Sequence, residues 1–281
     1  MPAEVGEAVS LLAEEPDRLI VAGGTDVVPS LTARALAPRR VLSLARLSKL
    51  DGVGPDGSGA LRIGARLTAA GAPAVAALLP AFAHAAAFGP PGVRGVATVG
   101  GNVVSAAGGD LLPLLVATRA RVVLESTQGT RRVPVAGFLE RRARRCEPGW
   151  VLDLDDPEHC QLRSGELVVG ICIAALPADA AVARLVLPGC GGRAALAMAV
   201  ARDAQEPRIR VAVQQGAGIP VRARDAEAGI SAELARVGRA VSPAAAADFA
   251  RGVGALGGDP YLRKAGTVLA RRLLTRILAA P

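Results

Sequence analysis

Aromatic side chains are nearly absent from this 281-residue chain, at 2% of residues, although 51% of residues are hydrophobic. The core must therefore be built from Leu, Val, Ile and Ala. Single-stranded nucleic acid is usually bound on aromatic stacking platforms, which so few aromatic residues cannot form. The net charge of +8 comes mainly from arginines spread along the chain. We therefore expect an arginine-rich surface that partly faces a partner protein, and no nucleic-acid binding.

Cysteine and histidine are also scarce, which argues against a metal site. The four cysteines have irregular spacing and form no C-x-x-C pair: Cys146, Cys160, Cys172 and Cys190. Zinc and iron-sulfur sites normally need closely spaced thiolate or imidazole ligands. The only histidines are His84 and His159. We predict free thiols in a reducing compartment, no metal ligands and a cytoplasmic location.

Long hydrophobic runs are missing as well. No run approaches the roughly 20 residues that a membrane-spanning helix needs. The first residues, MPAEVGEAVSLLAEEPDR, lack the basic and then apolar layout of a signal peptide. We expect no membrane span.

Hydrophobic periodicity predicts an α+β protein with two domains. Residues 1–50 read as helix, strand, glycine turn, helix and strand, and further strands are predicted near 52, at 61–64, in RVVLES and RRVPV, and in ELVVGICIA. Beyond residue 178 the sequence alternates like an antiparallel meander, and it ends in two helices opened by Ser242-Pro243 and Asp259-Pro260. We predict a domain at 1–177 and a C-terminal domain at 178–281 with three antiparallel strands and helices.

Two glycine motifs stand out: IVAGGTD at 20–26 and ATVGGNVVSAAGGD at 97–110. Each is a plain turn on one interpretation, because glycine tolerates positive φ and Thr-Asp suits a helix N-cap. On the other interpretation, paired Gly-Gly turns present converging backbone amides to one anion, and glycine lets a phosphate approach the main chain. Neither motif is a G-x-G-x-x-G fingerprint or a phosphate loop of NTPases.

The two motifs together resemble the FAD-binding (medium) subunit of the molybdenum hydroxylases, a family that includes the flavoprotein subunits of carbon monoxide dehydrogenase and xanthine dehydrogenase. The similarity rests on VAGGTDVVPSL and VRGVATVGGNVVSAAGGDLLPLLVATRARVVLES. GELVVGI fits the end of the flavin domain, and RIRVAVQQGAGIPVRARDAE and DPYLRKAGTVLARRLL fit the C-terminal domain. The resemblance implies a two-lobed flavin domain of the vanillyl-alcohol-oxidase-like type, with lobes at about 1–52 and 53–177.

The resemblance also implies which residues bind FAD. The first lobe would wrap the pyrophosphate with Ala22, Gly23, Gly24, Thr25 and Asp26. The second lobe would approach it with Thr98, Val99, Gly100, Gly101 and Asn102. Asp110 would accept hydrogen bonds from ribityl or ribose hydroxyls, or would instead cap the following helix, and Leu167 would lie near the flavin ring.

The chain departs from the family pattern at three places. Arg94-Gly95 stands where Arg-Asn is usual, the loop between Gly101 and Asp110 is one residue shorter and lacks Ser-Pro, and Arg193 stands without a preceding lysine. The stretch at 141–164 is also longer. These departures leave both glycine motifs intact.

The resemblance implies an electron-transfer subunit with no catalytic acid, base or nucleophile of its own. Its FAD would receive electrons from an iron-sulfur subunit, which is fed by a molybdenum-cofactor subunit, and pass them to NAD, oxygen or a quinone. Two alternatives remain open: a self-sufficient flavin oxidoreductase, and a degenerate scaffold that has lost FAD.

Overall fold

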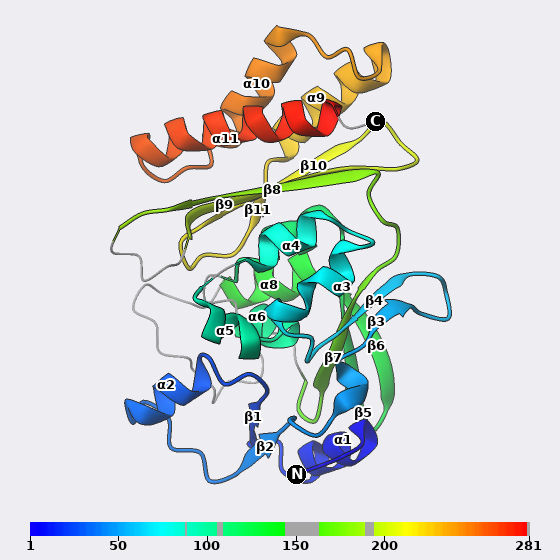
Figure 1. Ribbon diagram of the computed structural model, residues 1–281, viewed down its shortest axis with the longest axis vertical. Coiled ribbons are helices and arrows are strands. Elements are labelled where there is room, and N and C mark those ends of the chain that lie inside the picture. The colour runs from blue at the N-terminus through cyan, green and yellow to red at the C-terminus, as the bar shows by residue number, and fades with distance from the viewer. Residues whose placement is uncertain (88, 106–108, 144–162, 189–193, 280–281) are drawn as a thin grey trace. The chain divides into compact units, whose positions relative to one another are not determined.

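The computed structural model describes the 281-residue chain except residues 88, 106–108, 144–162, 189–193 and 280–281 (Figure 1). The predicted residues Cys146, Cys160, Cys190, His159 and Arg193 lie outside the described residues. The chain forms two compact units. The first contains 1–74, 90–106 and 120–174, and the second contains 75–89, 107–119 and 175–281. The predicted division at 177 stays a prediction.

The first unit begins with the predicted order of elements. Helix α1 (Val5–Glu14) leads to β1 (Leu19–Val21), and α2 (Val27–Thr32) leads to β2 (Val41–Ser43). Strands β1 and β2 pair in parallel, with Leu19 opposite Val41. The glycine turn at 22–26 therefore connects a strand to a helix, as parallel strands require a crossover between them.

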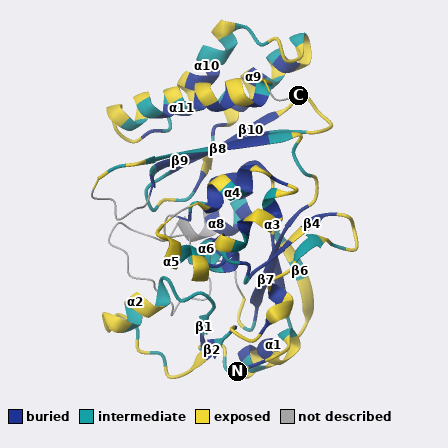
Figure 2. Ribbon diagram, viewed as in Figure 1, coloured by how far each residue is buried: buried dark blue, intermediate teal, exposed yellow. Residues whose placement is uncertain are grey.

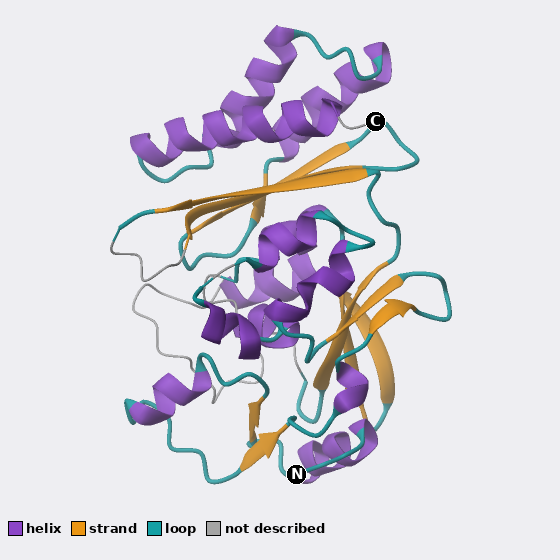
Figure 3. Cartoon of the chain, viewed as in Figure 1, coloured by secondary structure: helices purple, strands orange, loops and turns teal. Residues whose placement is uncertain are grey.

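A five-stranded antiparallel sheet forms the centre of the first unit (Figure 3). Its strand order is β3 (Val53–Pro55), β4 (Leu61–Gly64), β7 (Leu167–Ile173), β5 (Arg121–Ser126) and β6 (Gly129–Pro134). Every residue of the middle strand β7 is buried. This explains its unbroken apolar sequence, because both of its faces are covered.

Helices cover both faces of this sheet. Helix α1 contacts β5 and β7, while α6 (Val99–Ser105) contacts β4 and β7, and α8 (Val135–Ala143) contacts β5 and β6. The remaining short elements are η1 (Ser48–Leu50), η2 (Ala69–Gly71), α3 (Ala72–Ala76) and α5 (Pro91–Val96). The second glycine motif forms α6 and therefore packs against β4 and β7.

The second unit is built on a four-stranded antiparallel sheet. Its order is β11 (Val221–Arg222), β10 (Ile209–Gln215), β9 (Ala194–Arg202) and β8 (Asp179–Val186). Helices α9 (Arg224–Val237), α10 (Pro243–Gly254) and α11 (Pro260–Ala279) lie over one face (Figure 1). Helices α4 (Ala81–Ala86) and α7 (Leu112–Ala117) contact the same sheet.

Strand β9 shows why this sheet carries helices on both faces. Leu196, Met198 and Val200 belong to the core shared with the C-terminal helices. The alternate positions 197, 199 and 201 are buried alanines, and they belong to the face that α7 covers. Small side chains let the backbone of α7 approach the sheet closely.

The C-terminal domain differs from the predicted three strands and two helices. Strand β11 adds a fourth strand, and its two residues are too short to show any alternation. Helix α9 adds a third helix, with Ile230 and Leu234 buried at i, i+4 spacing. Its mixed charged sequence hid this spacing.

No described helix is long and apolar enough to cross a membrane. Among the described residues, no group of three His, Cys, Asp or Glu side chains is placed to hold a metal ion.

Candidate functional site

The first glycine motif forms an open turn between β1 and α2. Gly24 has a φ of +72°, a conformation that disfavours side chains. The turn is closed by the amide of Val28, which donates to the carbonyl of Gly24 at 2.8 Å. Within the described part of the chain, no hydrogen bond is donated by the amides of Gly23, Gly24 or Thr25. Gly23, Gly24 and Thr25 are themselves half-buried residues.

Gly23 brings the first motif against the segment that precedes the second. A Cβ atom built on Gly23 would lie 2.0 Å from the carbonyl oxygen of Val96 and 3.3 Å from Cα of Ala97. Real Cβ atoms do not approach backbone oxygens this closely, so only glycine fits. The structure therefore places the two sequence motifs side by side within the first unit.

The second motif is not an open turn, as the sequence had suggested, but the start of α6. The amide of Val99 donates to Leu67 at 2.9 Å and that of Gly100 to Ala65 at 2.8 Å, both to carbonyl oxygens. The amide of Gly101 donates to Oγ1 of Thr98 at 3.1 Å, which makes Thr98 a helix cap. These amides are satisfied within the chain, so the second motif is not an amide nest.

Gly100 is needed for packing against the loop that follows β4. A Cβ on Gly100 would lie 2.9 Å from both the Cβ and the carbonyl oxygen of Ala65. Sequence reasoning missed residues 65–68 as the support of this motif. No signal revealed them, because their contribution is made by backbone carbonyls, which every residue type carries.

Asp110 lies in the second unit and forms an ion pair there. Its Oδ1 is 3.1 Å from Nη1 of Arg184 on β8, and its side chain is only 8% exposed. Arg184 also donates to the carbonyl of Ala87. Helix α7 has no side-chain cap hydrogen bond at its N-cap residue, Leu111. The role of Asp110 toward a ligand stays a prediction, and Arg184 is its protein partner.

Leu167 is a core residue at the start of β7. It is 1% exposed and packs in a cluster with Val9 and Leu12 of α1. Its predicted contact with a flavin ring stays a prediction. Gly95, the departure from the family pattern, is exposed on α5, and no atom lies within 4 Å of the position that a Cβ would occupy there. A side chain would fit at this position.

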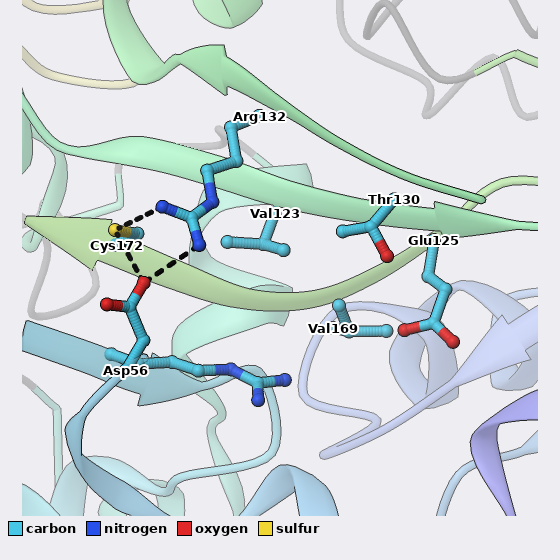
Figure 4. Close-up of a pocket in the computed structure, with 8 residues that line it drawn as sticks. Asp56, Val123, Glu125, Thr130, Arg132, Val169 and Cys172 are labelled. Atoms are coloured by element: carbon cyan, nitrogen blue, oxygen red, sulfur yellow. Dashed lines mark hydrogen bonds and ion pairs between the residues drawn. The ribbon is translucent and has the colours of Figure 1, made fainter. Parts of the chain in front are cut away.

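A separate hollow of about 170 Å³ lies on the sheet of the first unit (Figure 4). Nη2 of Arg132 lies 2.8 Å from Oδ2 of Asp56, and this pair joins the β3–β4 hairpin to the edge strand β6. Cys172 lies beside the pair, with its Sγ 3.7 Å from Nη1 of Arg132 and 3.9 Å from Oδ2 of Asp56 (Figure 4). Burial raises the pKa of its thiol. The lining combines Arg62 and Arg132 with the carboxylates of Asp56 and Glu125, so cations and anions are mixed in this hollow.

Asp56 gives the hollow a pH dependence that can be measured. Hydrogen bonds from the hydroxyl and the amide of Ser58 lower the pKa of Asp56 from 3.8 to about 2. A carboxyl group whose pKa is lower in the folded state stabilises the fold above its unfolded-state pKa. We expect the stability difference between wild type and Asp56→Asn to shrink as the pH falls from 3.8 through about 2. Urea unfolding followed by circular dichroism between pH 2 and 5 checks this, and a pH-independent difference would contradict it.

Comparison with known families decides the assignment of the chain. Residues 1–175 match the model of the FAD binding domain in molybdopterin dehydrogenase, which is more than half of the chain. The chain belongs to this family. The resemblance inferred from the glycine motifs is confirmed, and FAD is confirmed as the cofactor of the family.

Individual relatives agree with this assignment. The chain is 35% identical over 145 residues to the carbon monoxide dehydrogenase medium chain of Hydrogenophaga pseudoflava, covering 49% of this chain and 50% of that protein. It is 34% identical over 142 residues to a putative xanthine dehydrogenase FAD-binding subunit of Escherichia coli (strain K12), covering 48% of each. The match thus spans about half the length of these curated relatives.

A solved structure supports the fold of the whole chain. The chain is 28% identical to a chain of carbon monoxide dehydrogenase from Hydrogenophaga pseudoflava, in a form that lacks the Mo-pyranopterin moiety of the molybdenum cofactor. The TM-score is 0.78, with 99% of this chain and 96% of that chain covered. The predicted mixture of helices and sheets is confirmed.

Proposed function

We propose that this family member is the FAD-binding electron-transfer subunit of a molybdenum hydroxylase-type dehydrogenase. The observation that supports it most is the turn at 22–26, whose amides from Gly23 to Thr25 have no acceptor among the described residues. A pyrophosphate carries two negative charges and accepts hydrogen bonds from amides and hydroxyls. The donor set of the turn therefore fits the central part of FAD.

The two motifs have different roles in this proposal. The amides of Gly23, Gly24 and Thr25 donate to the pyrophosphate, with the hydroxyl of Thr25 as a further donor. Thr98 and Asn102 offer a hydroxyl and a carboxamide from the start of α6 on the neighbouring side. FAD lies between lobes at about 1–52 and 53–177, in the manner of vanillyl-alcohol-oxidase-like proteins.

We assign to Asp110 a contact with the ribityl or ribose part of FAD. A carboxylate accepts hydrogen bonds from ribityl or ribose hydroxyls, and the ion pair with Arg184 restrains its orientation. This gives Arg184 a positioning role that the sequence alone did not reveal. Leu167 stays a candidate for an apolar contact near the ring.

The bound FAD supplies redox chemistry, since a flavin accepts electrons singly and releases them in pairs. The chain itself binds and orients the cofactor, and we assign it no catalytic acid, base or nucleophile. Its electrons come from an iron-sulfur subunit that is fed by a molybdenum-cofactor subunit, and they leave to an external acceptor in the cytoplasm.

A comparison of flavins tests the role of the turn. We expect the apoprotein to bind FAD about 100-fold more tightly than riboflavin, because hydrogen bonds to a charged group contribute about 1.5–3 kcal/mol each. ADP, which carries the diphosphate without the flavin, should compete with FAD. Calorimetric titration measures the binding of all three ligands. Equal affinities for FAD and riboflavin would show that the turn does not bind the pyrophosphate.

A further inference from the structure

The last helix, α11, carries positive charge without any negative charge. Its sequence, PYLRKAGTVLARRLLTRILA, contains five Lys or Arg residues and no Asp or Glu. The nearest preceding acid, Asp259, is occupied at the helix start, where it accepts a hydrogen bond from the amide of Leu262 at 2.8 Å. The helix therefore presents a single sign of charge.

Helix α11 has an exposed side (Figure 2). By sequence this side carries cations together with apolar residues. The inner side is buried in the core of the second unit through Gly266, Ala270, Leu273, Leu274 and Ile277. On the outer side, Tyr261 is 57% exposed and Val268 is 44% exposed. Seven residues are almost two helical turns, so these two side chains lie on the same side of the helix. At 3.6 residues per turn, Lys264 and Arg271 flank them on one edge and Arg272 on the other.

Helix stability does not account for this pattern. The macrodipole favours cations in the last turn, such as Arg276, but gives no support to the cations earlier in the helix. Arg272 and Arg276 are four residues apart, where like charges destabilise a helix. Among the described residues, no ion pair involves Lys264, Arg271, Arg272 or Arg276. An intramolecular partner for these charges is lacking in that part of the chain.

We propose that the outer face of α11, defined by Tyr261, Lys264, Val268, Arg271 and Arg272, docks on an acidic surface of a partner protein. This inference rests on the proposed function, which makes the chain one subunit of a larger complex. Tyr and Arg are enriched at the energetically important positions of interfaces, and an apolar centre with a charged rim is the usual arrangement. Guanidinium groups pair bidentately with carboxylates.

A protein partner fits this face better than a membrane or a nucleic acid. The apolar side of α11 is already buried against its own sheet, so it is not free to enter a lipid surface. Phosphate backbones need cations alone, whereas the centre of this face is formed by Tyr261 and Val268.

Charge reversal in the co-expressed complex tests the proposal. The chain is produced with the iron-sulfur and molybdenum-cofactor subunits, and the double variant Arg271→Glu, Arg272→Glu is compared with wild type. We expect about tenfold or greater loss of co-purified subunits, with FAD content and melting temperature unchanged. The control reverses Arg224, an exposed arginine at the start of α9, and should co-purify as wild type does. Tyr261→Ala and the neutral pair Arg271→Gln, Arg272→Gln keep the test valid if the reversed pair fails to fold.

The outcomes separate this inference from the proposed function. Equal co-purification of the α11 variants and wild type would overturn the docking surface. Failure of wild type to assemble with either subunit would instead overturn the proposed function. Wild type is also tested against phosphatidylserine vesicles and duplex DNA. If wild type binds either one and the α11 variants do not, while the variants still assemble, the outer face of α11 binds a membrane or DNA and the inference is overturned.

Discussion

Gly23→Ala is expected to abolish FAD retention. The added Cβ would lie 2.0 Å from the carbonyl oxygen of Val96, a backbone atom that cannot rotate away. The turn must then separate from the segment before α6, which moves the free amides of Gly24 and Thr25. Overpacking of this kind typically costs about 1–3 kcal/mol of stability. Flavin released by denaturation and urea unfolding measure the two effects.

Gly95→Ala is the matched control for this substitution. Nothing lies within 4 Å of a Cβ built at Gly95, and the residue lies in helix α5. Replacing a glycine inside a helix by alanine stabilises the folded state by about 0.5–1 kcal/mol. This variant should therefore keep its FAD and unfold at a higher urea concentration than wild type. Full FAD content in Gly23→Ala, or an equal loss of FAD in both variants, would contradict the role of the turn at 22–26 in FAD binding. An unchanged far-ultraviolet circular dichroism spectrum in Gly23→Ala would separate local rearrangement from global unfolding.

Reduction of the flavin by substrate is expected only in the assembled complex. In the proposed function the chain supplies no catalytic acid, base or nucleophile, and its flavin receives electrons only from the partner subunits. Carbon monoxide and xanthine serve as probes, and the absorption of the flavin is followed without air. The probe that the complex oxidises should bleach the flavin of the complex and leave the isolated chain unchanged. Dithionite is the control that shows the isolated flavin to be reducible. Equal rates in both preparations would favour a self-sufficient flavin oxidoreductase.

The strands and the first glycine turn could be predicted from the sequence because their signals are local. Leu19–Val21 and Leu167–Ile173 are apolar runs, and Gly24 needs a positive φ in the turn that follows the first of them. Strand β11 was missed because two residues carry no periodicity.

The state of the second glycine motif could not be predicted, for a different reason. Its amides bind the carbonyls of Ala65 and Leu67, which lie far away in the sequence and can belong to any residue type. The ion pair of Asp110 with Arg184 likewise joins the segment before α7 to β8, and only the fold reveals it. Sequence reasoning therefore proposed residues for the candidate site, and their contacts with FAD stay a prediction. It did not reveal that the amides of the first motif lack acceptors among the described residues while those of the second are bonded within the chain.

The flavin content of the purified wild-type chain tests the central claim most directly. The protein is expressed with sufficient riboflavin, purified, and examined by visible absorption, and the released flavin is identified and quantified against protein. The turn holds three amides without an acceptor among the described residues, and only glycine fits at position 23. We therefore expect an equimolar amount of bound FAD. A folded, colourless protein that also fails to take up added FAD would contradict the account and favour the degenerate scaffold.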